Sequence, residues 1–295
     1  MIYTMLLGRL GNHLFIYAYA RALQLKHGHR NILIDVSSVR HNSLAAYALP
    51  EEVSFTAERR VEQQLNFLQR TALSYHAKKT AGMNQNQRFC FEKKQARLFN
   101  LLGLMICANG YLPLKGRRKD MLLYGYFQSE KFFGEIRQTL LEDLVPIDPP
   151  PPKNEPLLQK IDQTQSVCVS IRRGDFLGNP WHEVCTMDYF AKAMDVMAQK
   201  VQNPVFFIFS DDVDWLKTNA QFKYPVFFED GTDPDYEKLR MMSRCKHFVL
   251  SNSSFSWWAQ YLSTHPGKVV AAPDRWYATP VPCDVYHPDW ILIKP

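Results

Sequence analysis

Strands and helices alternate along the second half of this chain, and this alternation limits its fold more than any other feature. The predicted strands are residues 167–171, 205–210, 225–228, 247–250 and 268–272, and the predicted helices between them are 187–200, 235–244 and 255–263. Strands that alternate with helices favour a parallel sheet covered by helices on both faces. The sequence therefore predicts an α/β fold.

The first half begins with the same pattern, and a proline run separates the two halves. Residues 2–6 and 31–35 are typical of strands, 12–26 of a helix, and 58–110 look mostly helical. The run from Pro149 to Pro152 is stiff and suits neither element, so we interpret it as an interdomain linker. Two domains are predicted, residues 1–148 and residues 149–295.

The composition is that of a globular protein without a disulfide framework. Hydrophobic residues make up 46% of the chain and aromatic residues 13%, which excludes a disordered protein. The six cysteines are widely spread and show no zinc-binding spacing, so we expect free thiols in a reducing cytoplasm. The N-terminus lacks the basic start of a signal peptide, and the longest strongly apolar run, 101–108, is too short to cross a bilayer. The expected location is the cytoplasm.

Residues 170–176, Ser-Ile-Arg-Arg-Gly-Asp-Phe, carry the strongest indication of a functional site. Arg172 and Arg173 come directly after a predicted strand. Adjacent guanidinium groups repel each other, and each is shaped to bind phosphate or carboxylate through two parallel hydrogen bonds. Gly174 permits a tight turn, and Asp175 can hold an arginine in place. The pattern favours an anion site, with a surface ion-pair turn as the alternative.

Two further polar turns follow strands of the same predicted sheet. Asp211 and Asp212 come after the strand 205–210, and Ser-Asn-Ser-Ser at 251–254 comes after the strand 247–250. Ligands of open parallel sheets bind at the carboxyl ends of the strands. The run 251–254 also precedes a helix, where hydroxyl groups and free backbone N–H groups suit an anion. We therefore expect the three turns to line one cleft.

The turn between the first strand and the first helix completes a set of four motifs. It reads Gly-Arg-Leu-Gly-Asn-His at residues 8–13 and differs from the dinucleotide-binding fingerprint. Together with 172–176, 209–212 and 251–258, and in this order, it resembles the motifs of the α-1,2-fucosyltransferases, glycosyltransferase family 11. The chain resembles a bacterial member of that family from end to end.

The resemblance implies both a fold and a reaction. The implied fold is GT-B-like, with two Rossmann-like domains facing a cleft, an acceptor-side domain at 1–148 and a donor-binding domain at 149–295. The implied donor is GDP-fucose, and the sugar moves with inversion to a 2-hydroxyl group, usually of galactose. No cofactor and no essential metal are implied.

The chemistry of the leaving group agrees with this interpretation. Departure of GDP leaves negative charge on the β-phosphate, which fixed cations can stabilise in place of a metal ion. We expect Arg172 to contact the phosphates, and Arg173 to be either a second contact or a structural group. The general base is not identified by the sequence, and Asp35, Asp175 and Glu183 are its candidates.

The remaining predicted site residues fall into two groups. Predicted donor-binding residues are Gly11, Asn12, Ser170, Arg172, Arg173, Asp211, Asp212, Ser251, Asn252, Ser253 and Ser254, and predicted acceptor-binding residues are His13, Trp181 and His182. Three positions depart from the family pattern, since Ser170 replaces His, His13 replaces Gln, and Glu183 replaces Gly in a His-Gly-x-Cys segment. In related fucosyltransferases the His that corresponds to Ser170 helps to contact the guanine nucleotide. Ser170 therefore predicts a changed donor contact.

Basic residues crowd the middle of the chain, whose formal net charge is +6. They are Lys78, Lys79, Arg88, Lys93, Lys94, Arg97, Lys115, Arg117, Arg118 and Lys119. If the acceptor is built on a lipid carrier, these residues predict attraction to the inner face of the membrane, with Leu101, Leu102, Leu104 and Ile106 as an interfacial helix face. The alternative for the basic residues is an ordinary solvated surface, and the alternative for the four apolar residues is a place in the core.

Three other functions stay open at this point. A metal-dependent nucleotide-sugar transferase would use Asp211, Asp212 and Asp214 as ligands. A nucleic-acid-binding protein would use the basic middle region, but no recognised binding motif is present and we expect no such partner. A non-catalytic sugar-nucleotide-binding protein is suggested by Ser170 and His13.

Overall fold

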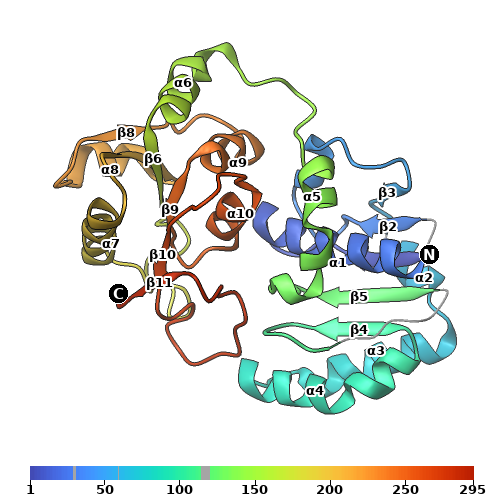
Figure 1. The fold of residues 1–295 in the computed structure, drawn as a ribbon. Helices are drawn as coiled ribbons and strands as arrows, with labels where there is room; N and C mark the ends of the chain where they lie inside the picture. The colour runs from blue at the N-terminus through green and yellow to red at the C-terminus, as the bar shows by residue number, and fades with distance from the viewer. Residues whose placement is uncertain (29–30, 59, 114–119) are drawn as a thin grey trace. The chain divides into compact units, whose positions relative to one another are not determined.

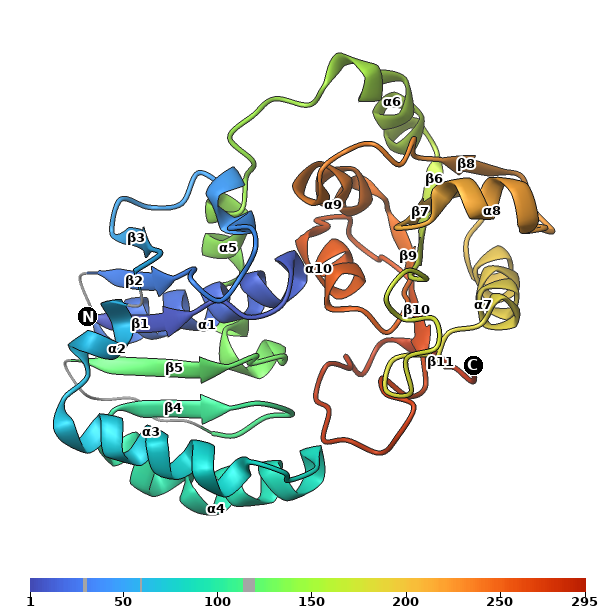
Figure 2. The same ribbon diagram turned by 180° about the vertical axis from the view of Figure 1, so that it is seen from behind.

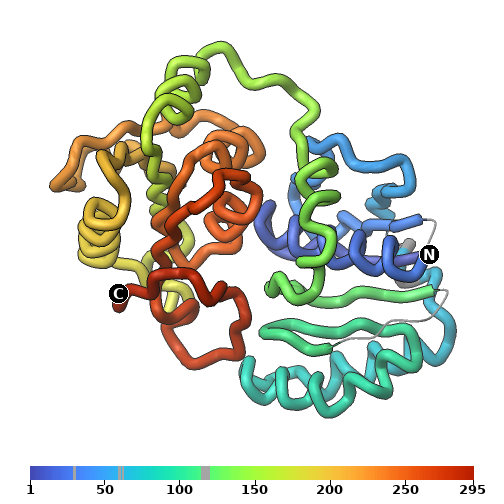
Figure 3. The backbone as a smooth tube through the Cα atoms, viewed as in Figure 1, coloured from blue at the N-terminus to red at the C-terminus, as the bar shows by residue number. Residues whose placement is uncertain are grey.

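The chain folds into two units, each built around a parallel sheet (Figure 1). The computed structural model describes residues 1–28, 31–58, 60–113 and 120–295. The first unit comprises Met1–Val145 and Pro280–Val285, and the second comprises Pro146–Thr279 and Tyr286–Pro295. Figure 3 follows the open connection that joins α5 to α6 and contains the proline run.

The first unit has a parallel sheet with the strand order β3-β2-β1-β5-β4. Its strands are β1 (Ile2–Met5), β2 (Ile32–Asp35), β3 (Val53–Thr56), β4 (Leu104–Cys107) and β5 (Met121–Gly125). Its helices are α1 (Leu10–His27), α2 (Arg60–Gln64), α3 (Phe67–Thr80), α4 (Gln85–Leu101) and α5 (Arg137–Asp143), with short 3-10 turns at Ser43–Ala46, Glu130–Phe132 and Gly134–Ile136. Strands β1, β4 and β5 are buried almost throughout, which explains their almost continuous apolar sequence.

Helices α3 and α4 form a hairpin beside the edge strand β4 of this sheet, as both Figure 1 and Figure 2 show. Each begins with a capping box, in which an asparagine and a glutamine three residues later exchange side chain to backbone hydrogen bonds: Asn66 with Gln69, and Asn84 with Gln87. Phe99 of α4 packs with apolar residues of the sheet in one buried cluster. The hairpin is therefore anchored by its inner face.

A buried carboxylate joins this hairpin to the sheet. Glu92 of α4 is fully buried. Its Oε1 lies 3.0 Å from His76 Nε2 of α3 and accepts a hydrogen bond from Arg88 Nε at 2.8 Å, and its Oε2 accepts one from Ala108 N at 2.9 Å, just beyond β4. Burial raises the pKa of this carboxyl, but the hydrogen bonds to it outweigh burial and hold the pKa below its ordinary value.

The second unit has a parallel sheet with the strand order β11-β10-β9-β6-β7-β8. Its strands are β6 (Gln165–Ile171), β7 (Pro204–Ser210), β8 (Val226–Phe228), β9 (His247–Val249), β10 (Val270–Pro273) and β11 (Ile291–Ile293). Its helices are α6 (Glu155–Gln163), α7 (Met187–Lys200), α8 (Val213–Asn219), α9 (Asp235–Arg244) and α10 (Ser254–Leu262), after a 3-10 turn at Pro152–Asn154. Tyr189 and Phe190 of α7 pack on Val167 and Val169 of β6 in its largest described core cluster.

The predicted α/β class with parallel sheets is confirmed, and α7 and α9 have the predicted bounds. The prediction that 58–110 is mostly helical is confirmed by α2, α3 and α4, except that residues 104–107 form strand β4. A short apolar run suits a buried parallel strand as well as a buried helix, so periodicity alone did not separate them. Leu104 and Ile106 are consequently core residues of a strand, and the proposed interfacial helix face does not exist as predicted.

The boundary between the two units differs from the predicted one near the C-terminus. Residues 280–285, predicted to belong to the second domain, pack with the first unit, where Asp284 accepts hydrogen bonds from Ser129 Oγ at 2.7 Å and Lys131 Nζ at 2.8 Å. The predicted basic residues 115–119 lie outside the described residues. In the described part of the chain, no helix combines the length and the apolar character needed to span a membrane.

Candidate active site

Three of the predicted turns meet at one edge of the second sheet. In that sheet β6 lies between β7 and β9, and all three strands run parallel. The arginine turn follows β6, Asp211 and Asp212 follow β7, and the 251–254 turn follows β9 and leads into α10. This edge, at the carboxyl ends of the strands, is where ligands bind in such sheets.

Arg172 is held in a fixed orientation by two carboxylates. Its Nη2 and Nε atoms donate to Asp175 Oδ1 at 2.6 and 3.0 Å, and Nε lies 3.2 Å from Asp211 Oδ2. A guanidinium group has five N–H donors, and these contacts use only one side of the fork. Among the described residues, Arg172 Nη1 has no hydrogen-bond acceptor. This side of the fork is therefore available for an anionic ligand.

Arg173 is held by one carboxylate and by an aromatic ring. Its Nε donates to Asp212 Oδ2 at 3.2 Å, and its guanidinium carbon lies 3.2 Å from the centre of the Trp215 ring. Stacking on the indole and pairing with a carboxylate both fix the plane of the group. This geometry favours the structural alternative for Arg173 over direct ligand contact.

The two aspartates that follow β7 organise the arginine turn. Asp211 Oδ1 accepts a hydrogen bond from Arg173 N at 2.9 Å, in addition to the contact of Asp211 Oδ2 with Arg172. A Cβ atom at residue 174 would lie 2.4 Å from Asp211 Oδ2, so Gly174 leaves the room that this carboxylate needs. The sequence suggested Asp211 and Asp212 as contacts for guanine or ribose, whereas in the structure both carboxylates are bound by arginine.

Side chains of the turn at 251–254 form hydrogen bonds both within the turn and to other segments. Ser253 caps α10, since its Oγ accepts a hydrogen bond from Phe255 N at 3.3 Å. Asn252 Nδ2 donates to His182 O at 3.0 Å and to Trp276 O at 2.9 Å, so this side chain ties two other segments to the turn. Ser251, Asn252 and Ser253 are buried, as is Ser170 at the end of β6, while Ser254 is partly exposed. Of the four residues in the turn, Ser254 is the most accessible to a ligand.

The loop after the arginine turn carries the other predicted residues. The rings of Phe176 and His182 stack with their centres 4.9 Å apart, and the Arg172 guanidinium lies 5.5 Å from the Phe176 ring centre. Partial burial lowers the pKa of His182, although the nearby charge of Asp175 opposes this shift. Trp181 is exposed beside it.

Two carboxylates of this region were predicted as candidates for the general base, and both are exposed. Glu183 Oε2 accepts a hydrogen bond from Gly178 N at 3.1 Å. Asp175 is already paired with Arg172. Glu183 therefore keeps a carboxylate oxygen free of charged partners among the described residues, whereas Asp175 does not.

The predicted residues of the first unit lie around the turn from β1 to α1. Gly8 has a φ of 76°, and a Cβ atom there would lie 2.2 Å from Asn12 Nδ2, so only glycine fits. Asn12 Oδ1 accepts a hydrogen bond from Gln128 Nε2 at 2.7 Å. Gly11 is buried in the first turn of α1. These contacts shape the turn itself.

His13 and Asp35 are buried, which a single sequence does not reveal. His13 Nε2 lies 3.2 Å from Gly8 O, and burial lowers the pKa of this imidazole to about 4. Asp35 Oδ1 accepts a hydrogen bond from Ser37 N at 2.9 Å in the turn after β2. In the described structure both side chains hold their own turns together, and neither is exposed to an acceptor sugar.

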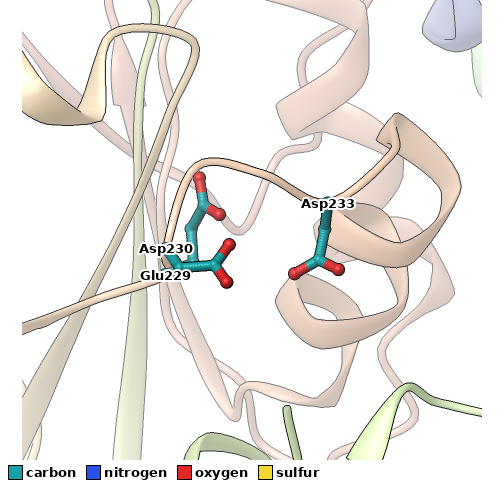
Figure 4. A group of neighbouring side chains, drawn as sticks. All are labelled: Glu229, Asp230 and Asp233. Atoms are coloured by element: carbon teal, nitrogen blue, oxygen red, sulfur yellow. The ribbon is translucent and has the colours of Figure 1, made fainter. Parts of the chain in front are cut away.

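An acidic cluster that was not predicted follows β8. Glu229, Asp230 and Asp233 each place a carboxylate oxygen within 4.8 Å of the others (Figure 4). Lys153 Nζ lies 2.9 Å from Asp230 and 3.1 Å from Asp233, and Lys238 Nζ lies 3.3 Å from Glu229. Each of the three carboxylates is thus paired with a lysine, and the two lysines offset two of the three negative charges that would attract a metal ion.

The two units define a class of fold. Each is built around a parallel sheet with helices, as in the GT-B-like α/β fold. The family model described as glycosyl transferase family 11 matches residues 1–294, and the chain belongs to this family. The family predicted from the four motifs is therefore confirmed.

Curated relatives and solved structures agree with this membership. The chain is 33% identical over 164 residues to an alpha-1,2-colitosyltransferase of Escherichia coli, in a match that spans 52% of this chain and about half, 55%, of that protein. It is 26% identical over 302 residues to the O-antigen biosynthesis glycosyltransferase WbnK of Escherichia coli, covering 94% of this chain and 95% of the relative. The fucosyltransferase NodZ from Bradyrhizobium has a similar fold, with a TM-score of 0.52, 15% identity, and coverage of 90% of this chain and 96% of NodZ.

Proposed function

We propose that this protein is an inverting glycosyltransferase that moves L-fucose from GDP-fucose to the 2-hydroxyl group of a galactoside. The observation that carries the proposal is the Arg172 guanidinium, which two carboxylates hold at the carboxyl edge of the sheet with one side of its fork unused. The resemblance of the four motifs to α-1,2-fucosyltransferases supports the choice of donor and of linkage.

Arg172 would act on the leaving group. As the bond between the anomeric carbon and the phosphate oxygen breaks, the electron pair stays on the β-phosphate of GDP. A donor that is already oriented stabilises this charge without reorganising during the reaction. Asp175 and Asp211 provide that orientation, and Arg173, stacked on Trp215, holds the turn in place.

The acceptor oxygen would attack the anomeric carbon from the face opposite to GDP, and its proton would pass to a general base. Of the three candidates, Asp35 is buried and Asp175 is paired with Arg172. Glu183, an exposed carboxylate on the loop beside the arginine turn, is the candidate that we retain. His182 and Trp181 on the same loop would contact the acceptor.

A product assay tests this function. Purified protein is incubated with GDP-fucose and a panel of galactosides, and the linkage of the product is determined by NMR. We expect an α-1,2-linked fucosyl galactoside. Because one relative is an alpha-1,2-colitosyltransferase, GDP-colitose is tested as donor in parallel. Transfer of colitose alone would correct the donor, and GDP binding without any transfer would show a non-catalytic nucleotide-binding protein.

Activity is expected to survive an excess of EDTA. The reason is that Asp211 and Asp212, the carboxylates that a metal ion would need at this edge, are bound by Arg172 and Arg173. A fixed guanidinium can stabilise the leaving pyrophosphate in the role that a divalent ion plays elsewhere. Initial rates are compared with and without chelator, and a metal-dependent transferase in the same buffer serves as the control. Loss of activity that magnesium or manganese restores would favour the metal-dependent alternative.

A further inference from the structure

Four large apolar side chains are exposed where the first turn of α3 meets the last turn of α4. The two helix ends are neighbours, because Gln69 Nε2 donates a hydrogen bond to Leu102 O at 3.0 Å. We call these four residues the apolar tip. Their exposed fractions are 76% for Phe67, 61% for Leu68, 51% for Leu98 and 61% for Leu101.

The apolar tip is separate from the core that anchors the hairpin. Phe99, next to Leu98 in the sequence, is buried against the sheet together with Leu104 and Leu122. Isolated exposed apolar residues are common on protein surfaces, but several large ones gathered at one place indicate an interaction surface. The apolar tip is therefore an interaction surface and not part of the core.

The same hairpin concentrates the positive charge of the chain. Residues 67–101 contain seven basic residues and one acidic residue, so their formal net charge of +6 equals that of all 295 residues. The acidic residue, Glu92, is buried and paired with Arg88 and His76, so it offsets the charge of Arg88 but not those of the other six basic residues. The basic residues are Arg70, Lys78, Lys79, Arg88, Lys93, Lys94 and Arg97.

Three of these basic residues surround the apolar tip directly. Arg70 lies three residues after Phe67, and Lys94 and Arg97 lie within one helical turn of Leu98. All three are exposed, and among the described residues none of them is paired with a carboxylate. The surface thus combines the apolar tip with three neighbouring positive charges. We call Arg70, Lys94 and Arg97 the basic ring.

This combination excludes some occupants on physical grounds. A second copy of the chain would place the same surface against itself in a two-fold dimer, so that the basic ring of one copy would face the basic ring of the other. Like charges brought together and removed from water repel. An anionic surface that also accepts apolar side chains is the complementary partner.

We propose that the apolar tip and its basic ring bind the surface of an anionic lipid bilayer. Phenylalanine and leucine side chains insert between lipid headgroups, while lysine and arginine interact with anionic lipids. Each basic residue close to such a surface strengthens binding about fivefold, and salt weakens this contribution. The proposal goes beyond the transfer reaction and does not depend on it, because it concerns side chains outside the candidate active site.

Vesicle flotation tests the proposal without any substrate. The probes are phosphatidylcholine vesicles with and without phosphatidylglycerol, at about 0.1 M and about 1 M salt, where the Debye length is about 10 Å and about 3 Å. We expect binding to the anionic vesicles at low salt and its loss at high salt. The double variant Phe67→Gln/Leu68→Gln should bind at least tenfold more weakly. The double variant Lys94→Gln/Arg97→Gln should also bind more weakly and should depend less on salt.

Matched variants control for the loss of apolar area and of charge. Val145→Gln/Ile147→Gln removes two other exposed apolar side chains, and Lys192→Gln/Lys200→Gln removes two charges from α7. Both should bind like the wild type, and all variants should unfold at the same temperature because every changed side chain is exposed. Equal failure of the wild type on both kinds of vesicle would overturn the proposal, as would undiminished binding by the hairpin variants. A wild-type dimer that the Phe67→Gln/Leu68→Gln change dissociates would identify a self-interface instead.

Discussion

Replacement of Arg172 by alanine is expected to lower the rate of transfer by about a hundred- to a thousandfold, the usual effect of removing one preoriented donor from a transition state. The change removes the guanidinium that we propose stabilises the leaving pyrophosphate. It removes one ion-pair partner of Asp175, but Asp175 is exposed and can be solvated by water, so the fold should persist. The measurement is kcat with GDP-fucose and an accepted galactoside, together with the unfolding temperature.

Two control variants sharpen this experiment. Arg172→Lys keeps the charge but loses the planar fork, so it should recover only part of the activity. Lys192→Ala removes an exposed charge from α7 in the same unit and should leave the rate unchanged. Wild-type turnover by Arg172→Ala would remove Arg172 from the mechanism.

Replacement of Glu92 by glutamine is expected to lower the free energy of unfolding by about 3–5 kcal/mol, the usual cost of breaking a buried ion pair on one side. The glutamine has a similar shape but no charge for Arg88, and it cannot accept all the hydrogen bonds that converge on the carboxylate. Urea unfolding followed by circular dichroism measures the change. Glu142→Gln, an exposed change on α5, should stay within about 0.5 kcal/mol.

The same carboxylate predicts a pH dependence. Hydrogen bonds hold the pKa of folded Glu92 below the ordinary value of 4.5, so the unfolded chain takes up a proton more readily than the folded chain. The stabilisation is therefore complete above the ordinary value and is lost as the pH falls through the lower, folded value. The difference in unfolding free energy between wild type and Glu92→Gln should shrink over this acid range. A difference that stays constant with pH would mean that the charge of Glu92 contributes nothing.

Much of the candidate site follows from local sequence. Apolar runs of strand length, each followed by polar residues, indicated where β6, β7 and β9 end. In a parallel sheet all carboxyl ends lie at one edge, so the convergence of the three turns was predictable without coordinates. Helices α7 and α9 were predicted with their observed bounds because their apolar faces and flanking polar residues are local signals.

The partners of the site residues were not predictable in the same way. Asp211 and Asp212 come from a different strand than the arginines they bind, and from the sequence they were equally plausible as contacts for guanine or for a metal ion. His13 lies in the first turn of α1 and Asp35 is the last residue of β2, positions that suit a functional residue, yet both are buried. The exposure of a side chain depends on segments far away in the sequence, so a single sequence does not predict it.

The sequence by itself determined the α/β class, the order of most elements in the second unit, the family, and the edge of the sheet at which the site lies. Only the tertiary structure decided which carboxylate holds which arginine, that Glu92 joins α3, α4 and β4, and that Leu104 lies inside a sheet while Leu101 is exposed. The physical reason is the range of the interactions. Periodicity, capping and turns depend on residues a few positions apart, whereas burial and ion pairing depend on contacts between distant segments that form only when the chain is folded.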